Sequence, residues 1–142
     1  GRDPLFVCIM NGSFMFASEL MYTIDEEWEV AFARYKSYEG TQSTGRLQEL
    51  MPVTQDLKGR VVVIVEDLID TGYTVYCLKK LFLEQGAAEV HIAAMLRKPE
   101  AVSCDVDTDY VAMDIENKFI LGHGLDYDEY GRMYKDIYQL KD

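Results

Sequence analysis

Apolar residues along the chain follow two patterns that predict β-strands. Uninterrupted apolar runs cover residues 5–10 and 61–65, as is typical of strands buried on both faces of a sheet. The run 61–65 is β-branched throughout and is therefore predicted to lie at the centre of the sheet. Residues 28–34 alternate instead, with Trp28, Val30 and Phe32 on the apolar face. Further strands are predicted at 47–53, 90–96, 109–115, 119–121 and 137–140.

Two other stretches repeat apolar residues every three or four positions, which is the period of a helix. Ser13 is a candidate N-cap of the first helix, and Gly86 a candidate C-cap of the second. Because the second helix lies between the strands 61–65 and 90–96, these elements form a βαβ unit whose right-handed crossover makes the strands parallel. The apolar positions are Phe14, Ala17, Leu20, Met21 and Ile24 in the first helix, and Val75, Leu78, Leu81 and Phe82 in the second.

No repeat, low-complexity tract or linker divides the chain, so a single domain is predicted over residues 1–142. Its fold class is α/β, with a mostly parallel twisted sheet flanked by helices and a small hood formed by the C-terminal strands. Residues 37–45, SYEGTQSTG, have no apolar period. This segment is predicted to be a long mobile loop, and such loops are usually functional or disordered.

Composition and charge narrow the classes of protein and partner. With 142 residues, 49% of them hydrophobic, the chain can bury a core without disulfides or a structural metal. Its three cysteines, Cys8, Cys77 and Cys104, lie far apart, which favours a reduced compartment. The apolar runs are much shorter than the roughly 20 residues of a membrane span, and no secretory signal is visible, so a cytoplasmic location is predicted. The net charge of −11 argues against nucleic acid or an anionic membrane as the main partner.

The segment 66–74, EDLIDTGYT, follows the central strand and has the parts of a phosphate site. Its glycine allows backbone N–H groups to turn toward an anion, its threonine hydroxyls can donate, and the helix N-terminus adds a positive dipole end. The adjacent acids Glu66 and Asp67 would repel a phosphate unless they bind sugar hydroxyls or a Mg²⁺ ion that bridges to it. The segment therefore predicts a site for a phosphorylated sugar with Mg²⁺. The alternative is an acidic turn in which Asp70 or Thr71 only caps the helix.

Residues 62–74, VVIVEDLIDTGYT, resemble the phosphoribosyl pyrophosphate (PRPP) signature of the type I phosphoribosyltransferases. Within these enzymes the chain resembles the hypoxanthine-guanine phosphoribosyltransferases nearly end to end. The further matching motifs are MNGSFMF at 10–16, KSY at 36–38, LRKP at 96–99 and NKFILGHGLDY at 117–127. The resemblance implies a type I phosphoribosyltransferase fold and purine salvage: hypoxanthine or guanine attacks C1 of PRPP, pyrophosphate leaves, and IMP or GMP forms with the help of Mg²⁺.

The resemblance also implies roles for residues at matching positions. Asp70 matches the family's proposed general base at purine N7. The residues matched to the ribose 5-phosphate part of PRPP are Glu66, Asp67, Asp70, Thr71, Gly72, Tyr73 through its amide, and Thr74. Those matched to the purine are Lys98, which donates to the 6-oxo group, Phe119, which stacks on the base, and Ile120, whose carbonyl contacts the base edge. Those matched to pyrophosphate and the closing lid are Asn11, Gly12, Ser37, Tyr38 and Arg132, and the matched metal ligands are Glu66, Asp67 and Asp126.

Other features of the chain extend or limit this interpretation. The family suggests a homodimer or homotetramer. It normally has an N-terminal segment before the first strand; that part is missing here, so apolar sheet surface is expected to stay uncovered. His91 and His123 are interpreted as neutral hydrogen-bonding residues, because the chemistry needs no second acid–base group. Two alternatives remain open: a related transferase for another nucleobase, and a regulatory protein of this fold that senses PRPP or nucleotide while binding nucleic acid. The net charge and the intact Asp70 argue against the second.

Overall fold

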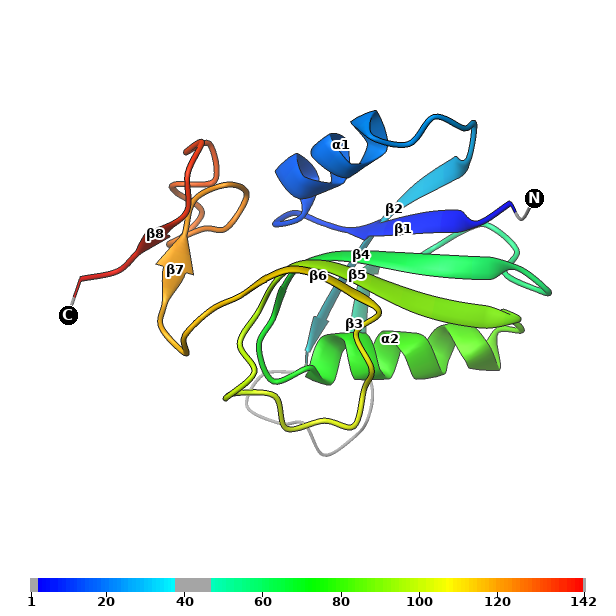
Figure 1. The fold of residues 1–142 in the computed structure, drawn as a ribbon. Helices are drawn as coiled ribbons and strands as arrows, with labels where there is room; N and C mark the ends of the chain where they lie inside the picture. Colours follow the sequence, from blue (N-terminus) through cyan, green and yellow to red (C-terminus); the bar gives the residue numbers. More distant parts are fainter. Residues whose placement is uncertain (1–2, 38–46, 142) are drawn as a thin grey trace.

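A six-stranded twisted sheet forms the centre of the molecule in this computed structural model, which describes residues 3–37 and 47–141 (Figure 1). The strand order is β3-β2-β1-β4-β5-β6, and all neighbours run parallel except β2 and β3. The strands are β1 (Leu5–Ile9), β2 (Glu29–Ser37), β3 (Leu47–Met51), β4 (Val61–Ile69), β5 (Glu89–Arg97) and β6 (Tyr110–Asp114). The mostly parallel α/β fold is confirmed, and β4 lies inside the sheet as predicted.

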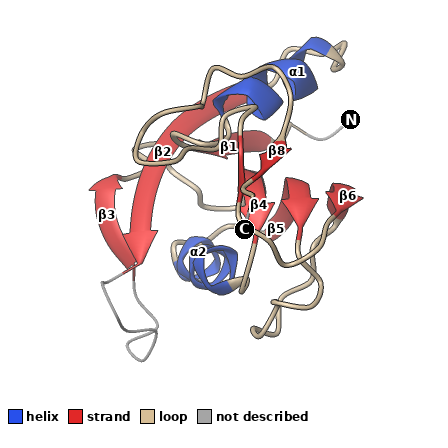
Figure 2. Ribbon diagram, turned by 90° about the vertical axis from the view of Figure 1, so that its left-hand side faces the viewer, coloured by secondary structure: helices blue, strands red, loops and turns tan. Residues whose placement is uncertain are grey.

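Two helices cover opposite faces of this sheet (Figure 2). Helix α2 (Tyr73–Glu84) buries Leu78 and Phe82 in the larger core, together with Val7 of β1 and Ile64 of β4. Helix α1 (Phe14–Tyr22) packs on the other face, where Cys8 and its neighbours form a second core cluster. Because successive side chains of a strand point to opposite faces, β1 and β4 are apolar at consecutive positions to serve both helices.

The two sides of β2 differ in how deeply they are buried. Ala31, Ala33 and Tyr35 face the α2 core and are buried, whereas Phe32 on the other side is 55% exposed. The short helix α1 covers its face only in part, so the larger apolar side chains of β2 are not the more buried ones. Trp28 and Val30 of the predicted apolar face pack partly buried against the α1 cluster, and only Phe32 of that face is mostly exposed.

The ends of the elements refine three further predictions. Strand β4 continues to Ile69, so Glu66 and Asp67 lie within the strand and not in the turn that follows. Ser13 occupies the N-cap position of α1, but its hydroxyl donates to the Ile9 carbonyl at 2.7 Å and does not cap the helix. Gln85 is the C-cap residue of α2, one position before the predicted Gly86, which follows with a φ of +99° in the left-handed region that favours glycine just after a helix.

The predicted hood is a separate two-stranded antiparallel sheet made by β7 (Ile120–Leu121) and β8 (Tyr138–Gln139). It stands beyond the end of the main sheet, on the side where α1 begins (Figure 1). Leu125 joins it to the body of the protein by packing with Met95 and Leu96 of β5. Among the described residues, no helix has the length and apolar character that crossing a membrane requires.

An apolar groove of about 920 Å³ stays open on the α1 face in the described part of the chain. Its lining includes Phe6, Trp28, Val63, Ala93 and Val111. The groove leaves apolar sheet surface uncovered on this face among the described residues.

Candidate functional site

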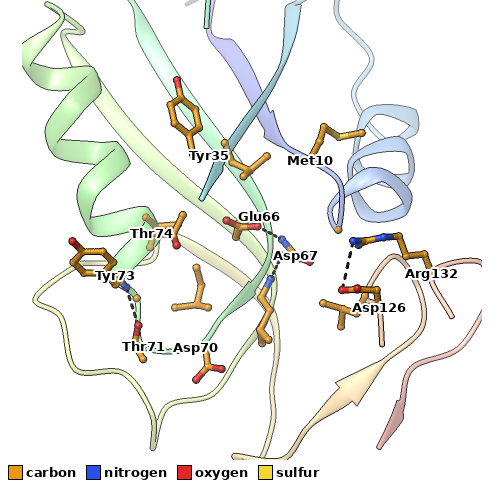
Figure 3. A pocket seen from close by; sticks show the side chains of 17 residues that line it. Met10, Tyr35, Glu66, Asp67, Asp70, Thr71, Tyr73, Thr74, Asp126 and Arg132 are labelled. Atoms are coloured by element: carbon orange, nitrogen blue, oxygen red, sulfur yellow. Dashed lines mark hydrogen bonds and ion pairs between the residues drawn. The ribbon is translucent and has the colours of Figure 1, made fainter. Parts of the chain in front are cut away.

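A cavity of about 350 Å³ lies at the carboxyl ends of the strands, between the start of α2 and the hood (Figure 3). Its walls come from the end of β1, the end of β4, the turn 70–74 and the hood segment 125–132. In Figure 3, Asp126 and Arg132 lie on one side, Thr71 and Thr74 on the other, and Asp67 between them. This edge of a parallel sheet is where ligands of α/β proteins usually bind.

Two neighbouring acids of β4 form the floor of the cavity. Glu66 is buried, with 7% of its surface exposed, and its Oε1 accepts a hydrogen bond from the Asp67 amide at 3.0 Å. Asp67 Oδ1 accepts from the Leu68 amide at 2.8 Å. Burial first, and the negative charge of Asp67 second, raise the pKa of Glu66 well above its ordinary value of 4.5. A cation or a set of hydroxyl donors beside Glu66 and Asp67 would lower the free-energy cost of keeping both acids ionised.

Three segments that are distant in the sequence meet at Gly12. A Cβ atom at Gly12 would lie 1.8 Å from Asp67 Oδ2, so the first loop packs its backbone directly on the β4 carboxylate. A Cβ atom at Gly124 of the hood would lie 2.1 Å from the Gly12 carbonyl oxygen. The peptide bond Met10–Asn11 just before this contact is cis. Glycines at these two positions allow the close approach of backbone that brings the hood to the floor of the cavity.

The turn 70–74 enters α2 through Gly72, whose φ of +87° is left-handed. The Thr71 hydroxyl accepts a hydrogen bond from the Tyr73 amide, the first of the helix, at 3.2 Å. The N-cap residue of α2 is Gly72, which provides no side-chain cap hydrogen bond, so neither Asp70 nor Thr71 acts as the N-cap. The Tyr73 amide was matched to a phosphate contact; in the described structure it donates to Thr71, because a threonine hydroxyl two residues earlier lies within reach of it.

Asp70 and Lys98 form an ion pair across the ends of β4 and β5. Lys98 is buried, with 6% of its surface exposed, and its Nζ lies 3.4 Å from Asp70 Oδ2. The Asp70 side chain is 51% exposed. The Lys98 amide also donates to the Ile69 carbonyl at 2.9 Å, and this contact holds the backbone of Lys98 beside that of Ile69, the residue before Asp70.

The hood places Asp126 and Arg132 opposite the turn. Arg132 Nη1 donates to the Gly124 carbonyl at 2.8 Å, and its Nη2 lies 3.5 Å from Asp126 Oδ1 and 3.3 Å from Glu129 Oε2. Asp126 Oδ2 accepts from the Glu129 amide at 2.8 Å. These contacts fix the guanidinium and the carboxylate at the wall of the cavity.

The structure brings most of the predicted site residues together. Those that line the cavity are Gly12, Glu66, Asp67, Asp70, Thr71, Gly72, Tyr73, Thr74, Asp126 and Arg132. Tyr38 lies outside the described residues. Five others do not line the cavity: Asn11, Ser37, Lys98, Phe119 and Ile120.

Each of these five has a physical reason for its place. Asn11 and Ser37 have exposed side chains, and the buried Lys98 pairs its ammonium with Asp70, which itself lines the cavity. Phe119, half exposed, packs edge-on against Tyr127 with ring centroids 5.7 Å apart. Phe119 and Ile120 belong to the hood edge, where the Phe119 carbonyl accepts from the Leu140 amide at 2.9 Å.

Sequence reasoning missed Tyr35, which lines the cavity from β2. Its hydroxyl accepts a hydrogen bond from the Val53 amide at 3.2 Å, and burial raises its pKa above the ordinary value of 10. The alternation of Ala31, Ala33 and Tyr35 was the available indication, because it places the three on one face of the strand. Within the described part of the chain, no group of three or more His, Cys, Asp or Glu side chains is arranged to hold a metal ion.

Comparison with known proteins agrees with this geometry. The family model described as phosphoribosyl transferase domain matches residues 1–128. The hypoxanthine-guanine phosphoribosyltransferase of Streptococcus pneumoniae is 43% identical over 143 residues, which cover all of this chain and 79% of the relative. A hypoxanthine phosphoribosyltransferase structure from Staphylococcus aureus matches with a TM-score of 0.93 at 33% identity, covering 99% of this chain and 77% of that one. The hypoxanthine phosphoribosyltransferase of Trypanosoma cruzi in complex with the product IMP matches with a TM-score of 0.91 at 30% identity, covering 99% and 76%. The chain therefore belongs to the phosphoribosyltransferase family, in the group of the hypoxanthine-guanine phosphoribosyltransferases.

Proposed function

We propose that the cavity between α2 and the hood is where this chain transfers the 5-phosphoribosyl group of PRPP to hypoxanthine or guanine. The bond between C1 of the ribose and a pyrophosphate oxygen breaks, and a ring nitrogen of the purine takes its place on C1. The purine loses a proton, and IMP or GMP and pyrophosphate are released. The observation that carries this proposal is the pair Glu66 and Asp67 on the floor of a cavity that also contains a helix N-terminus at Gly72.

The turn 70–74 is proposed to hold the 5′-phosphate. The hydroxyls of Thr71 and Thr74 border the cavity and can donate to phosphate oxygens. The N-terminus of the 12-residue helix α2 points to the same place, and its dipole favours a negative charge there. A phosphate would compete for the Tyr73 amide with the Thr71 hydroxyl, which is a weak neutral acceptor.

Glu66 and Asp67 are proposed to hold the ribose hydroxyls, directly or through Mg²⁺. The residues fit the ion, because the buried Glu66, whose pKa is raised by burial and by the charge of Asp67, lies beside that second acid, and Asp126 borders the same cavity. Mg²⁺ is commonly held by one or two carboxylates with phosphates and water as its other ligands, which agrees with the small number of acids at this site. A bound Mg²⁺ would supply neutralisation of the pyrophosphate charge.

The carboxylates and Arg132 also suit the charge that develops during the transfer. As pyrophosphate leaves, positive charge grows on the ribosyl carbon and negative charge on the leaving oxygens. Fixed carboxylates near the sugar and a guanidinium fixed by Gly124 near the pyrophosphate stabilise both without reorganising.

The purine is proposed to bind between the hood edge and the Asp70–Lys98 pair. Lys98 would donate to the 6-oxo group, Phe119 would stack on the base, the Ile120 carbonyl would contact its edge, and Asp70 would accept the proton from N7. The 3.4 Å separation of the two charges is long for a hydrogen bond between ions. A purine that bridges them can therefore replace this contact at modest cost.

The test is a turnover assay with PRPP, Mg²⁺ and hypoxanthine, guanine, xanthine or adenine in turn. Hypoxanthine and guanine should be consumed, and adenine more slowly by as much as about 10⁴-fold, because its 6-amino group offers no acceptor to a buried ammonium. Equal use of adenine would overturn the 6-oxopurine assignment. The homodimer or homotetramer suggested by the family and the cytoplasmic location are parts of the same proposal, and the molar mass in solution tests the first of them.

A further inference from the structure

His123 contacts two different segments through its two ring nitrogens: helix α1 through one and the segment before β8 through the other. Nε2 faces a carboxylate oxygen of Glu19 on α1, and Nδ1 faces the carbonyl oxygen of Lys135 in the segment before β8. The Lys135 carbonyl and an ionised Glu19 carboxylate can only accept, so both contacts are hydrogen bonds donated by the ring when it is an imidazolium. The interpretation of His123 as a hydrogen-bonding residue agrees with these two contacts, whereas its interpretation as neutral stays a prediction that the structure does not test.

The charges around this ring favour the protonated form. The hydrogen bond to the Lys135 carbonyl, followed by the hydrogen bond and negative charge of Glu19 and the charge of Asp136, raises the pKa of His123 above its ordinary value of 6.5, against an opposing effect of burial. Lys135, Asp136 and Glu19 are the charged residues that line the shallow cavity beside the ring.

The backbone beside His123 leads directly into the candidate active site. The His123 amide donates to the Tyr134 carbonyl at 2.8 Å. The next residue, Gly124, exchanges two contacts with Arg132: its amide donates to the Arg132 carbonyl at 2.9 Å, and its carbonyl accepts from Nη1. Gly124 also packs on the Gly12 carbonyl. A displacement of His123 from α1 would therefore displace Arg132 and Asp126 from the cavity wall.

We propose that the His123 imidazolium is a positioning residue, which holds the hood segment 122–132 against α1 and so keeps Asp126 and Arg132 at the cavity, and that this hold is released when the ring loses its proton. The expected effect of this hold on PRPP binding rests on the proposed function of the cavity. A histidine whose folded-state pKa is raised contributes its full stabilisation below the unfolded value of about 6.5 and loses it as pH rises through the folded value. We therefore expect substrate binding to weaken in mildly alkaline solution.

The first experiment measures the ring itself by NMR. The chain has two histidines, so His91→Gln leaves His123 as the single imidazole signal. At pH 6.5 both ring nitrogens should show the shifts of protonated nitrogen, and the midpoint of titration should fall in a His91→Gln, Glu19→Gln double variant. A neutral ring at pH 6.5, or a midpoint that Glu19→Gln leaves unchanged, would overturn the proposal.

The second experiment measures amide hydrogen exchange of the hood and needs no substrate. The Gly124 amide should exchange at least about tenfold faster in His123→Asn than in the wild type at pH 6.5, and the difference should shrink as pH rises. Asparagine suits this test because it tolerates the φ of +51° at position 123 and cannot reach Glu19. If His123→Asn fails to fold, the same comparison in Glu19→Gln replaces it. Equal exchange in variant and wild type at every pH would contradict the proposal.

The third experiment links the ring to the reaction. The KM for PRPP of His123→Asn at pH 6.5 should be raised at least about fivefold, with a smaller change in kcat, and its dependence on pH between 6.5 and 9 should be flatter than in the wild type. A purely structural role would not alter the pH profile, so an unchanged profile would refute the positioning role. Absence of any turnover in the wild type would instead refute the proposed function, while the NMR and exchange results would still decide the role of His123.

Discussion

Replacement of Asp70 by asparagine separates two contributions of that carboxylate. If Asp70 accepts the purine proton, Asp70→Asn should lower kcat by about a hundredfold or more, which corresponds to about 2.7 kcal/mol of transition-state stabilisation. PRPP binding should persist, because the amide keeps the shape of the turn that is proposed to hold the phosphate.

The same change also removes the negative charge that pairs with the Lys98 ammonium. Two unit charges at the observed 3.4 Å attract by about 1 kcal/mol in water and about 5 kcal/mol at an effective dielectric constant of about 20. Because Asp70 is half exposed, the lower part of this range applies, and asparagine retains an oxygen that can accept from the ammonium. We expect a loss of about 1 kcal/mol in the free energy of unfolding, which lowers Tm by about 2–4 °C.

Steady-state kinetics and thermal unfolding of the same samples provide the assay. Asp114→Asn is a matched control, since Asp114 pairs with Arg97 at 2.8 Å at the exposed end of β6 and does not line the cavity; it should leave kcat unchanged. The reasoning is refuted if Asp70→Asn keeps near-normal kcat, or if its loss of activity merely follows its loss of folded protein.

Three further changes test other parts of the site. Lys98→Ala should reduce the use of 6-oxopurines and narrow the preference over adenine, whereas Phe119→Ala should raise KM for all purines by a similar factor of about ten; a full preference retained in Lys98→Ala would contradict this. Gly12→Ala should lower kcat/KM by about a hundredfold, the scale of an ångström-sized misplacement, because its Cβ would collide with a β4 carboxylate. Gly59→Ala, whose Cβ would meet open space at a φ of +73°, should cost stability only; a similar loss of activity in both would contradict the collision. Glu66→Gln should raise Tm at pH 7 by at least about 2 °C while weakening PRPP binding, since a carboxyl whose pKa is raised by burial loses stability as pH rises above 4.5; an unchanged or lower Tm would contradict it.

Strands and helices were predictable wherever the apolar pattern of a segment matches the faces that the fold buries. The run 61–65 is apolar at every position because β4 contacts helices on both faces, and the helical period from Val75 to Phe82 is strong because α2 buries one side. The pattern on β2 was ambiguous, since both of its faces carry apolar residues. How well each face is covered depends on the lengths of α1 and α2, which side-chain size on β2 does not encode.

The sequence predicted which residues form the candidate site better than it predicted which of them contact one another. The motif 66–74 identified the acids and the turn, and the βαβ unit placed the ends of β4 and β5 at one edge of the sheet. The pairing of Lys98 with Asp70 and the approach of Gly124 to Gly12 depend on how separate loops end at that edge. Local sequence carries no information on these distances. The same holds for His123, whose pKa is raised by the Lys135 carbonyl and then by the Glu19 carboxylate, both from distant parts of the chain.

The charges around the cavity have a consequence for the speed at which substrate arrives. Among the described residues that line it, four acids face one arginine: Glu66, Asp67, Asp70 and Asp126 oppose Arg132. A polyphosphate diffusing toward this wall meets a field of its own sign, added to that of a protein with a net charge of −11. Salt screens repulsion between like charges, so the encounter rate rises with ionic strength, the reverse of electrostatically steered association. A polyphosphate that carries its own divalent cation is repelled less, so the concentration of free divalent cation is expected to affect how fast the substrate is captured.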